Sequence, residues 1–259
     1  MRAPASEPAL VTENLTIRFG GHVAVNAVSC AFNPGELTVI VGPNGAGKTT
    51  YFNLISGQLP ASEGRVFKGG EDITRLAPSA RARRGIGRAF QLTNLFPALT
   101  VLENIRLAVQ ARSGHGWRFF SPVSRFASLT EEAEHYLEET KLSAKAHMTA
   151  AALPHGDQRK LEVALLMAME PDIYMFDEPT AGMSLDHTPD VLELIAKLKQ
   201  DKSKTILLVE HKMSVVRALA DRIIVLHNGE LLADGPPDEV MQSQVVREVY
   251  LGSSGEDAA

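Results

Sequence analysis

The sequence predicts an α/β fold in which a largely parallel sheet is preceded by β-rich segments and interrupted by a helical insertion. Continuous apolar runs alternate with helical patterns, which is typical of parallel sheets covered on both faces. A glycine-rich loop separates one such run from a helix near the start of the chain. Mostly helical patterns fill the stretch from about residue 92 to residue 170, which we therefore interpret as an inserted lobe.

The individual elements follow from the patterns in chain order. Strands are expected at residues 10–19, 22–32 and 36–42, followed by a helix from about Gly47 to Ser56 and short strands at 65–68 and 85–90. Helical patterns occupy residues 101–111, 129–142 and 158–169. Strands at 173–176, 205–210 and 222–227 then alternate with helices at about 189–200 and 213–220. Residues 252–259 have too little apolar content to pack, so we expect them to be disordered.

The composition is that of an ordinary globular protein. Apolar residues make up 44% of the 259 residues, and the net charge of −5 gives no reason to expect nucleic acid as a partner. The single cysteine, Cys30, cannot form an internal disulfide, which suits a reducing compartment. The longest apolar runs are far shorter than the ~20 residues needed to span a bilayer. We therefore expect any role at a membrane to come through a partner.

The segment RSGHGWRFFSPVSRF (112–126) interrupts the helical lobe and contains the only tryptophan, Trp117, beside two adjacent phenylalanines. Such a group of aromatic side chains can form a local cluster that caps the lobe. It can also contact a membrane partner or a lipid surface. The sequence leaves both interpretations open.

A phosphate-binding loop is predicted by GPNGAGKTT (42–50), which follows an apolar strand and opens a helix. Glycines let backbone N–H groups turn inward around phosphate oxygens, and the positive end of the following helix points at the same anion. Lys48 is expected to reach the β- and γ-phosphates, and the Thr49 hydroxyl is expected to bind Mg²⁺. The loop's candidate binding residues are Gly42, Asn44, Gly45, Gly47, Lys48, Thr49 and Thr50.

Polar residues at the ends of other apolar runs complete a predicted catalytic site. Asp177 and Glu178 end the run IYMF, where Asp177 can hold Mg²⁺ and Glu178 can polarise an attacking water. His211 ends another run and is expected to reach the γ-phosphate. Gln91 follows the strand at 85–90, and its amide can bind Mg²⁺ or orient water. Ligands of parallel sheets bind at the carboxyl ends of the strands, where these residues are predicted to meet.

These elements, in this order, resemble the nucleotide-binding subunit of ATP-binding cassette (ABC) transporters over residues 8–251. The resemblance implies a P-loop NTPase core, an antiparallel β-subdomain and an inserted helical subdomain at about residues 92–170. It also implies ATP and Mg²⁺ as cofactors and a second ABC ATPase subunit, with two ATP molecules sandwiched head-to-tail. Phe19 matches the aromatic residue that stacks on adenine, although a buried phenylalanine at a strand end is the alternative.

LPHGDQ (153–158) matches the signature loop of this family, most often Leu-Ser-Gly-Gly-Gln, which binds the γ-phosphate held by the other subunit. Pro154 has neither a hydroxyl nor an N–H group, so one expected donor is missing. His155 and the backbone of Gly156 are the remaining candidates for phosphate binding, together with the helix dipole. Asp157 is unexpected near a phosphate, because two anions repel, but it is favourable in the first turn of a helix.

Several further segments resemble the branched-chain or hydrophobic amino-acid uptake branch of the family. They are FGGxxAVN (19–26), NLFPALTVLENI (94–105), the insertion at 112–126 and REVYLG (247–252). The resemblance implies an ATP-hydrolysing importer subunit at the cytoplasmic face of the cell membrane. Its partners would be permease subunits, a homologous or identical ATPase subunit and, indirectly, a periplasmic or extracellular solute-binding protein.

An exporter or a lipid-extraction ATPase with the same fold is the alternative function. Soluble ABC proteins that act on DNA or ribosomes form a third class, but they usually need tandem cassettes or a long coiled-coil insertion. The sequence shows neither feature, so we rank that class last.

Overall fold

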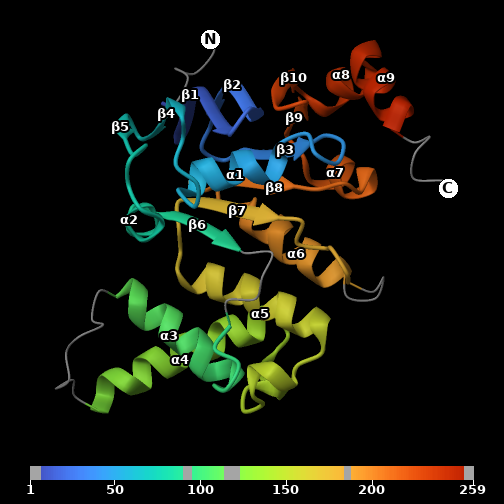
Figure 1. Cartoon of the computed structure of the whole chain (residues 1–259). Helices are drawn as coiled ribbons and strands as arrows, with labels where there is room; N and C mark the ends of the chain where they lie inside the picture. Colours follow the sequence, from blue (N-terminus) through green and yellow to red (C-terminus); the bar gives the residue numbers. More distant parts are fainter. Residues whose placement is uncertain (1–6, 90–94, 114–122, 184–187, 254–259) are drawn as a thin grey trace, which may run out of the picture. The chain divides into compact units, whose positions relative to one another are not determined.

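The computed structural model describes residues 7–89, 95–113, 123–183 and 188–253 of the chain, which form two compact units (Figure 1). The first unit comprises the described parts of residues 1–86, 172–178 and 199–259. The second comprises those of residues 87–171 and 179–198. Among these described residues, no helix combines the length and the apolar character that a membrane crossing requires.

A four-stranded antiparallel sheet begins the first unit. Its order is β2-β1-β4-β5, with the bounds β1 (Leu10–Phe19), β2 (His22–Phe32), β4 (Glu63–Lys68) and β5 (Glu71–Asp72). Gly20 and Gly21 form the turn between β1 and β2, and Gly20 has a φ of 58°, which favours glycine. The turn makes Phe19 and His22 direct cross-strand partners.

The larger sheet has the order β10-β9-β3-β8-β7-β6 and is mainly parallel. Its strands are β3 (Leu37–Val41), β6 (Ile86–Ala89), β7 (Ile173–Asp177), β8 (Thr205–Val209), β9 (Arg222–His227) and β10 (Glu230–Gly235). Every residue of β3, β7 and β8 is buried, which explains why these strands read as continuous apolar runs. β3 pairs in parallel with β8 and β9, and β7 pairs in parallel with β8, so their carboxyl ends lie at one edge.

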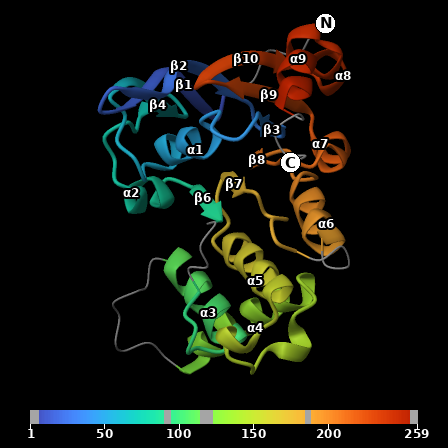
Figure 2. The ribbon, with the colours of Figure 1, turned by 45° about the vertical axis from the view of Figure 1, so that its right-hand side comes forward.

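Helix α1 (Lys48–Ser56) lies between the antiparallel sheet and the larger sheet (Figures 1 and 2). Its buried side chains Tyr51, Phe52 and Ile55 belong to one apolar core with residues of both sheets. Burial of each such side chain stabilises the fold by roughly 1.5–3 kcal/mol. The position of α1, and with it the loop that precedes it, is therefore fixed by the core of the first unit.

The second unit is a cluster of helices. It contains α3 (Val101–Arg112), α4 (Val123–Glu139), α5 (His155–Ala168), α6 (Thr188–Leu198) and the 3₁₀ turns η1 (Ser143–Lys145) and η2 (Ala150–Ala152). α3 packs against α4 and α5, and α5 packs against α6. The start of α3 is fixed by a reciprocal capping box, in which Thr100 and Glu103 satisfy each other's backbone N–H groups.

Several short elements were absent from the sequence prediction. They are β5, β10, α2 (Pro78–Arg83), α8 (Pro237–Gln242) and α9 (Gln244–Ser253). β5, α2 and α8 are too short to show a clear hydrophobic period. α5 begins at His155 instead of residue 158, and α4 at Val123 instead of residue 129. The disorder prediction for residues 252–259 lies mostly outside the described residues, but α9 continues to Ser253.

Candidate active site

The loop between β3 and α1 is shaped by close backbone approaches. A β-carbon at Gly42 would lie 2.1 Å from the carbonyl oxygen of Leu226, and one at Gly47 would lie 2.5 Å from that of Ala24. Gly47 also has a φ of 95° and is the N-cap of α1. Because glycine has no side chain, it cannot cap the first N–H groups of the helix, which remain available for an anion.

Lys48 is the first residue of α1, and its side chain is almost fully buried against this loop. Its Nζ donates hydrogen bonds to the carbonyl oxygens of Gly42, at 2.8 Å, and Pro43, at 2.9 Å. Burial lowers the pKa of Lys48 from its usual value, while the negative charges of Glu178 and Asp177 oppose that shift. The ammonium group is thus held in the loop within electrostatic reach of the acidic pair.

The acidic pair lies at the carboxyl end of β7. Asp177 is the last residue of the strand and is buried, and the N–H of Glu178 donates a hydrogen bond to the carbonyl oxygen of Val209. Glu178 has a φ of 51°, a left-handed conformation that costs a non-glycine residue about 1–2 kcal/mol. Such backbone strain is characteristic of functional sites.

His211 follows the end of β8 and meets this carboxylate. Its Nε2 lies 2.6 Å from Oε1 of Glu178, and both side chains retain partial exposure, 40% and 23% respectively. Because β7 and β8 are parallel neighbours, their carboxyl ends bring together two residues that are 33 positions apart. A histidine and a carboxylate in contact can hold a water molecule and share its protons.

One pocket of the first unit collects most of the predicted residues. Its volume is about 340 Å³, within the range of small-molecule sites. It is lined by His22, Ala24, Asn44, Gly45, Ala46, Gly47, Lys48, Thr49, Thr50, Glu178 and His211. Gly42 shapes the loop behind it, and Asp177 is buried beside Glu178.

The remaining predicted residues lie elsewhere. Phe19 is 50% exposed at the end of β1 and is not buried, which excludes the alternative of a buried strand-end side chain. His155 and Gly156 lie in the second unit, in the first turn of α5. Gln91, the third predicted Mg²⁺ ligand, and the aromatic segment around Trp117 lie outside the described residues.

The segment LPHGDQ forms the start of α5, with Pro154 as its N-cap. Asp157 is almost fully buried and forms ion pairs with Lys145 and Lys160, the latter at 3.0 Å. Burial alone would raise the pKa of Asp157, but the hydrogen bonds from both lysines outweigh it and lower this pKa below its usual value. The Asp157 charge is therefore neutralised within the second unit, which answers the question of how an acidic residue is tolerated here.

Sequence analysis did not identify His22 and Ala24 as pocket residues. They come from β2, which belongs to the antiparallel sheet, whereas the glycine-rich loop follows β3 of the larger sheet. One signal was present: the Gly20–Gly21 turn pairs His22 with Phe19, the expected adenine-binding aromatic.

Comparison with known proteins identifies the family. The ABC transporter family matches residues 25–181, and the family described as "Branched-chain amino acid ATP-binding cassette transporter" matches residues 230–256. The branched-chain amino acid transport ATP-binding protein BraF of Pseudomonas aeruginosa is 38% identical over 96% of this chain and 100% of its own length. LivG of Escherichia coli, with the same description, is 37% identical over 96% of this chain and 100% of its own length.

Solved structures agree with this assignment. The ADP conformation of the ABC transporter cassette MJ1267 superimposes with a TM-score of 0.80 and 32% identity, covering 95% of this chain and all of that one. A dimeric MJ0796 cassette bound to ADP and phosphate gives a TM-score of 0.75 and 27% identity, covering 88% of this chain and 98% of that one. The predicted P-loop α/β fold with its antiparallel sheet and helical unit is thus confirmed. The chain belongs to the ABC transporter family, as an ATP-binding and ATP-hydrolysing subunit.

Proposed function

We propose that this chain hydrolyses ATP to drive uptake of branched-chain or other hydrophobic amino acids, or related compounds, through a membrane permease. The chemistry is carried by the 2.6 Å contact between Glu178 and His211 in the pocket that Lys48 and Thr49 also line. The substrate class is supported by the match of residues 230–256 and by the descriptions of BraF and LivG. These matches favour the importer over an exporter or a lipid-extraction ATPase.

ATP binding uses the loop and the start of α1. The N–H groups around Gly45 and Gly47 surround the phosphates, and Lys48 neutralises part of their charge. Gly42 and Asn44 of the loop and Thr50 of the first turn of α1 complete this binding site, while Phe19 stacks on adenine through its exposed ring.

Mg²⁺ fits the donor atoms beside this loop. The hydroxyl-bearing Thr49 lines the pocket. The carboxylates of Asp177 and Glu178 lie close enough to the Lys48 ammonium for their charges to act on it. Oxygen donors of the kind that Mg²⁺ prefers are therefore gathered where Lys48 would meet the phosphates. We assign Thr49 and Asp177 as the residues that hold the ion, with Gln91 as a third. The ion would neutralise charge on the β- and γ-phosphates.

Hydrolysis is assigned to Glu178 and His211. Glu178 accepts a proton from a water molecule whose oxygen attacks the γ-phosphorus, while the bond from that phosphorus to the bridging oxygen of ADP breaks. His211 holds the Glu178 carboxylate and the γ-phosphate in place. The existing contact between the two side chains orients the base before the substrate arrives.

Two direct protein partners and one indirect partner follow from this function. A second ABC ATPase subunit would receive His155 and Gly156 of this chain at the γ-phosphate of its own ATP, and its corresponding residues would complete the pocket described above. The permease would hold the chain at the cytoplasmic face of the cell membrane. A solute-binding protein would deliver the substrate to the permease without touching this chain.

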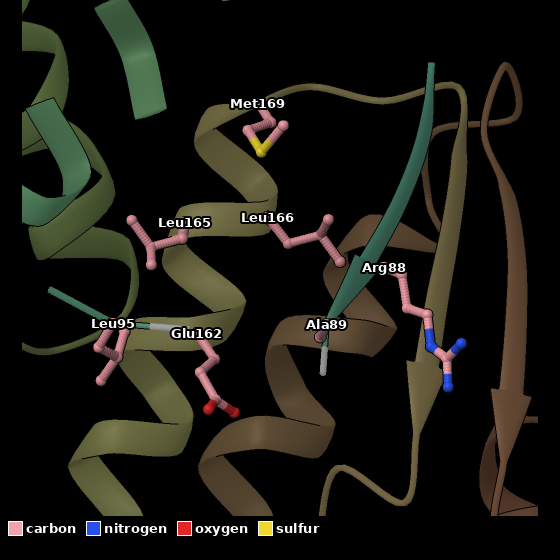
Figure 3. Close-up of a pocket in the computed structure, with 7 residues that line it drawn as sticks. All are labelled: Arg88, Ala89, Leu95, Glu162, Leu165, Leu166 and Met169. Atoms are coloured by element: carbon pink, nitrogen blue, oxygen red, sulfur yellow. The ribbon is translucent and has the colours of Figure 1, made fainter. Parts of the chain in front are cut away.

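We assign the permease contact to the surface around a pocket of the second unit (Figure 3). A pocket of about 130 Å³ is lined by Arg88, Ala89, Leu95, Glu162, Leu165, Leu166 and Met169. Figure 3 shows Leu166 extending from α5 toward β6, while the Arg88 guanidinium points away from α5. Met169 is 40% exposed here, and Oε1 of Glu162 has no hydrogen-bond partner among the described residues. An apolar segment would match this surface.

The function is tested by transport in proteoliposomes that contain the permease, this chain and its partner ATPase, with the solute-binding protein added on the side from which uptake occurs. ATP supplied on the side of the membrane that carries this chain should drive uptake of labelled leucine, isoleucine or valine. Omission of ATP should abolish this uptake. Met169→Glu places a charge in the apolar pocket and should remove uptake while ATP binding persists. ATP-dependent export of these amino acids would contradict the proposal. ATP hydrolysis without any uptake of them would contradict it as well.

A further inference from the structure

His22 lies in the nucleotide pocket although it belongs to the antiparallel sheet. The pocket brings it together with the residues of the glycine-rich loop from Asn44 to Thr50 and with Glu178 and His211. The imidazole is exposed, so it is available to a ligand that enters the pocket. Phe19, the residue that the sequence assigns to adenine, is not among the residues that line this pocket.

The strand that carries His22 is fixed to the glycine-rich loop by its backbone. The carbonyl oxygen of Ala24 occupies the space where a β-carbon of Gly47 would lie, at 2.5 Å. The N–H of Asn26 donates to the carbonyl oxygen of Gly229, at 2.8 Å, and the N–H of Gly229 donates to that of Ala46, at 3.1 Å. β2 therefore cannot shift relative to the loop without breaking these contacts.

The position of His22 along β2 determines which part of a bound nucleotide the His22 side chain can contact. Residues two apart on a strand face the same side and lie about 6.6 Å apart, so His22 is one such step from Ala24 at the N-terminus of α1. Its cross-strand partner is Phe19, and directly paired residues project from the same face of the sheet. His22 thus lies between the phosphate loop and the exposed Phe19 ring.

We propose that the His22 imidazole binds the nucleoside half of ATP, at the ribose and the edge of the base, while Phe19 stacks on the base. This inference rests on the proposed function, since it needs the triphosphate to occupy the glycine-rich loop. The phosphates then contribute affinity through the loop and α1, and the Phe19–His22 pair contributes affinity for the nucleoside. His22 is accordingly a binding residue and takes no part in the proton transfer.

Equilibrium binding of ATP, ADP and inorganic tripolyphosphate to the full chain tests the proposal. His22→Ala should raise the Kd for ATP and for ADP by about five- to tenfold, the effect of losing one hydrogen bond or ring contact. The Kd for tripolyphosphate should stay unchanged, because it has no nucleoside. His147→Ala removes an exposed histidine of the second unit and is the matched control.

The outcomes separate the two proposals. An unchanged Kd for ATP in His22→Ala overturns the role of His22. An equal loss for tripolyphosphate also overturns it, because the effect then lies in the phosphate loop. Failure of the wild-type chain to bind ATP would instead contradict the proposed function. Thermal unfolding of each variant checks that the substitution leaves the fold intact.

Discussion

Asp157 stands where signature loops of this family most often carry glutamine, and its side chain is turned into the second unit. Lys160, on the same helix, holds one carboxylate oxygen at 3.0 Å, and Lys145 from the 3₁₀ turn η1 holds the other. Lys160 also contacts Asp190 of α6, at 3.3 Å. The carboxylate thus joins the start of α5 to η1 and, through Lys160, to α6.

Replacing Asp157 with asparagine should destabilise the second unit. The Lys160 pair is nearly buried, with side-chain exposures of 7% and 4%, so losing the carboxylate leaves a buried ammonium with Asp190 as its remaining anionic partner. Because that partner is retained, the loss should stay at about 1–3 kcal/mol, and the Lys145 pair adds less because Lys145 is more than a third exposed. Thermal and urea unfolding measure the loss, and Glu131→Gln, at an exposed site of α4, is the control.

The same variant has a defined pH dependence. The folded-state pKa of Asp157 is lowered, so its ion pairs contribute fully above the unfolded pKa of about 4. That contribution is lost as the pH falls through the folded pKa. The stability difference between wild type and Asp157→Asn should therefore be constant at neutral pH and shrink in acid. A difference that grows in acid would contradict the assigned charge state.

The orientation of Asp157 could not be predicted from the sequence. Its partner Lys145 is 12 residues away, on a short 3₁₀ turn that has no sequence signature. The contact between Glu178 and His211 was easier to predict from the sequence, because two apolar runs that end in polar residues predict neighbouring parallel strands. His22 was not predicted as a pocket residue because its strand, β2, belongs to the antiparallel sheet and not to the parallel one.

At the scale of elements, α1 is held at both ends. Its N-terminus is formed by the glycine-rich loop, and the buried Arg81 of α2 lies at its C-terminus. Arg81 Nη1 donates to the carbonyl oxygens of Leu54, at 2.7 Å, and Ile55, at 2.6 Å. Its remaining nitrogens donate to Thr74, at 2.6 Å, and Leu76, at 3.1 Å. A cation here also complements the negative end of the helix.

Arg81→Met should lower the free energy of unfolding by at least about 3 kcal/mol, because it removes several charge-assisted bonds and leaves buried carbonyl groups unpaired. ATP affinity should fall as well, since α1 carries the phosphate loop. Arg83→Met, an exposed position of the same helix, should change neither quantity. If Arg81→Met unfolded like the wild type, α1 would not depend on this contact.

The strand–loop–helix unit around the phosphate loop was predictable because each part has its own local signal. β3 is a fully buried apolar run, and Gly42 and Gly47 mark positions where a β-carbon would clash with neighbouring backbone. The start of α5 was predicted three residues late, since proline, histidine and glycine do not resemble a usual helix start. α2 gives too short a pattern, yet Arg81 makes it important for α1.

At the scale of the whole molecule, the predicted chemistry is divided between the two units. The residues of the phosphate pocket, the acidic pair and His211 belong to the first unit, whereas His155 and Gly156 belong to the second. In the function we propose, a single chain thus carries one set of residues for its own ATP and another for the ATP of a second subunit. This division explains why the function we propose requires a second ATPase subunit.

The most direct measurement compares ATP turnover and ATP affinity of the wild type and Glu178→Gln in the assembled transporter. Glutamine keeps the size of the side chain but cannot accept a proton, so turnover should fall at least about 100-fold while the Kd for ATP stays within about threefold. Glu239→Gln, an exposed carboxylate of α8, should turn over like the wild type. Wild-type hydrolysis by Glu178→Gln would show that another group activates the water and would contradict the account of this site.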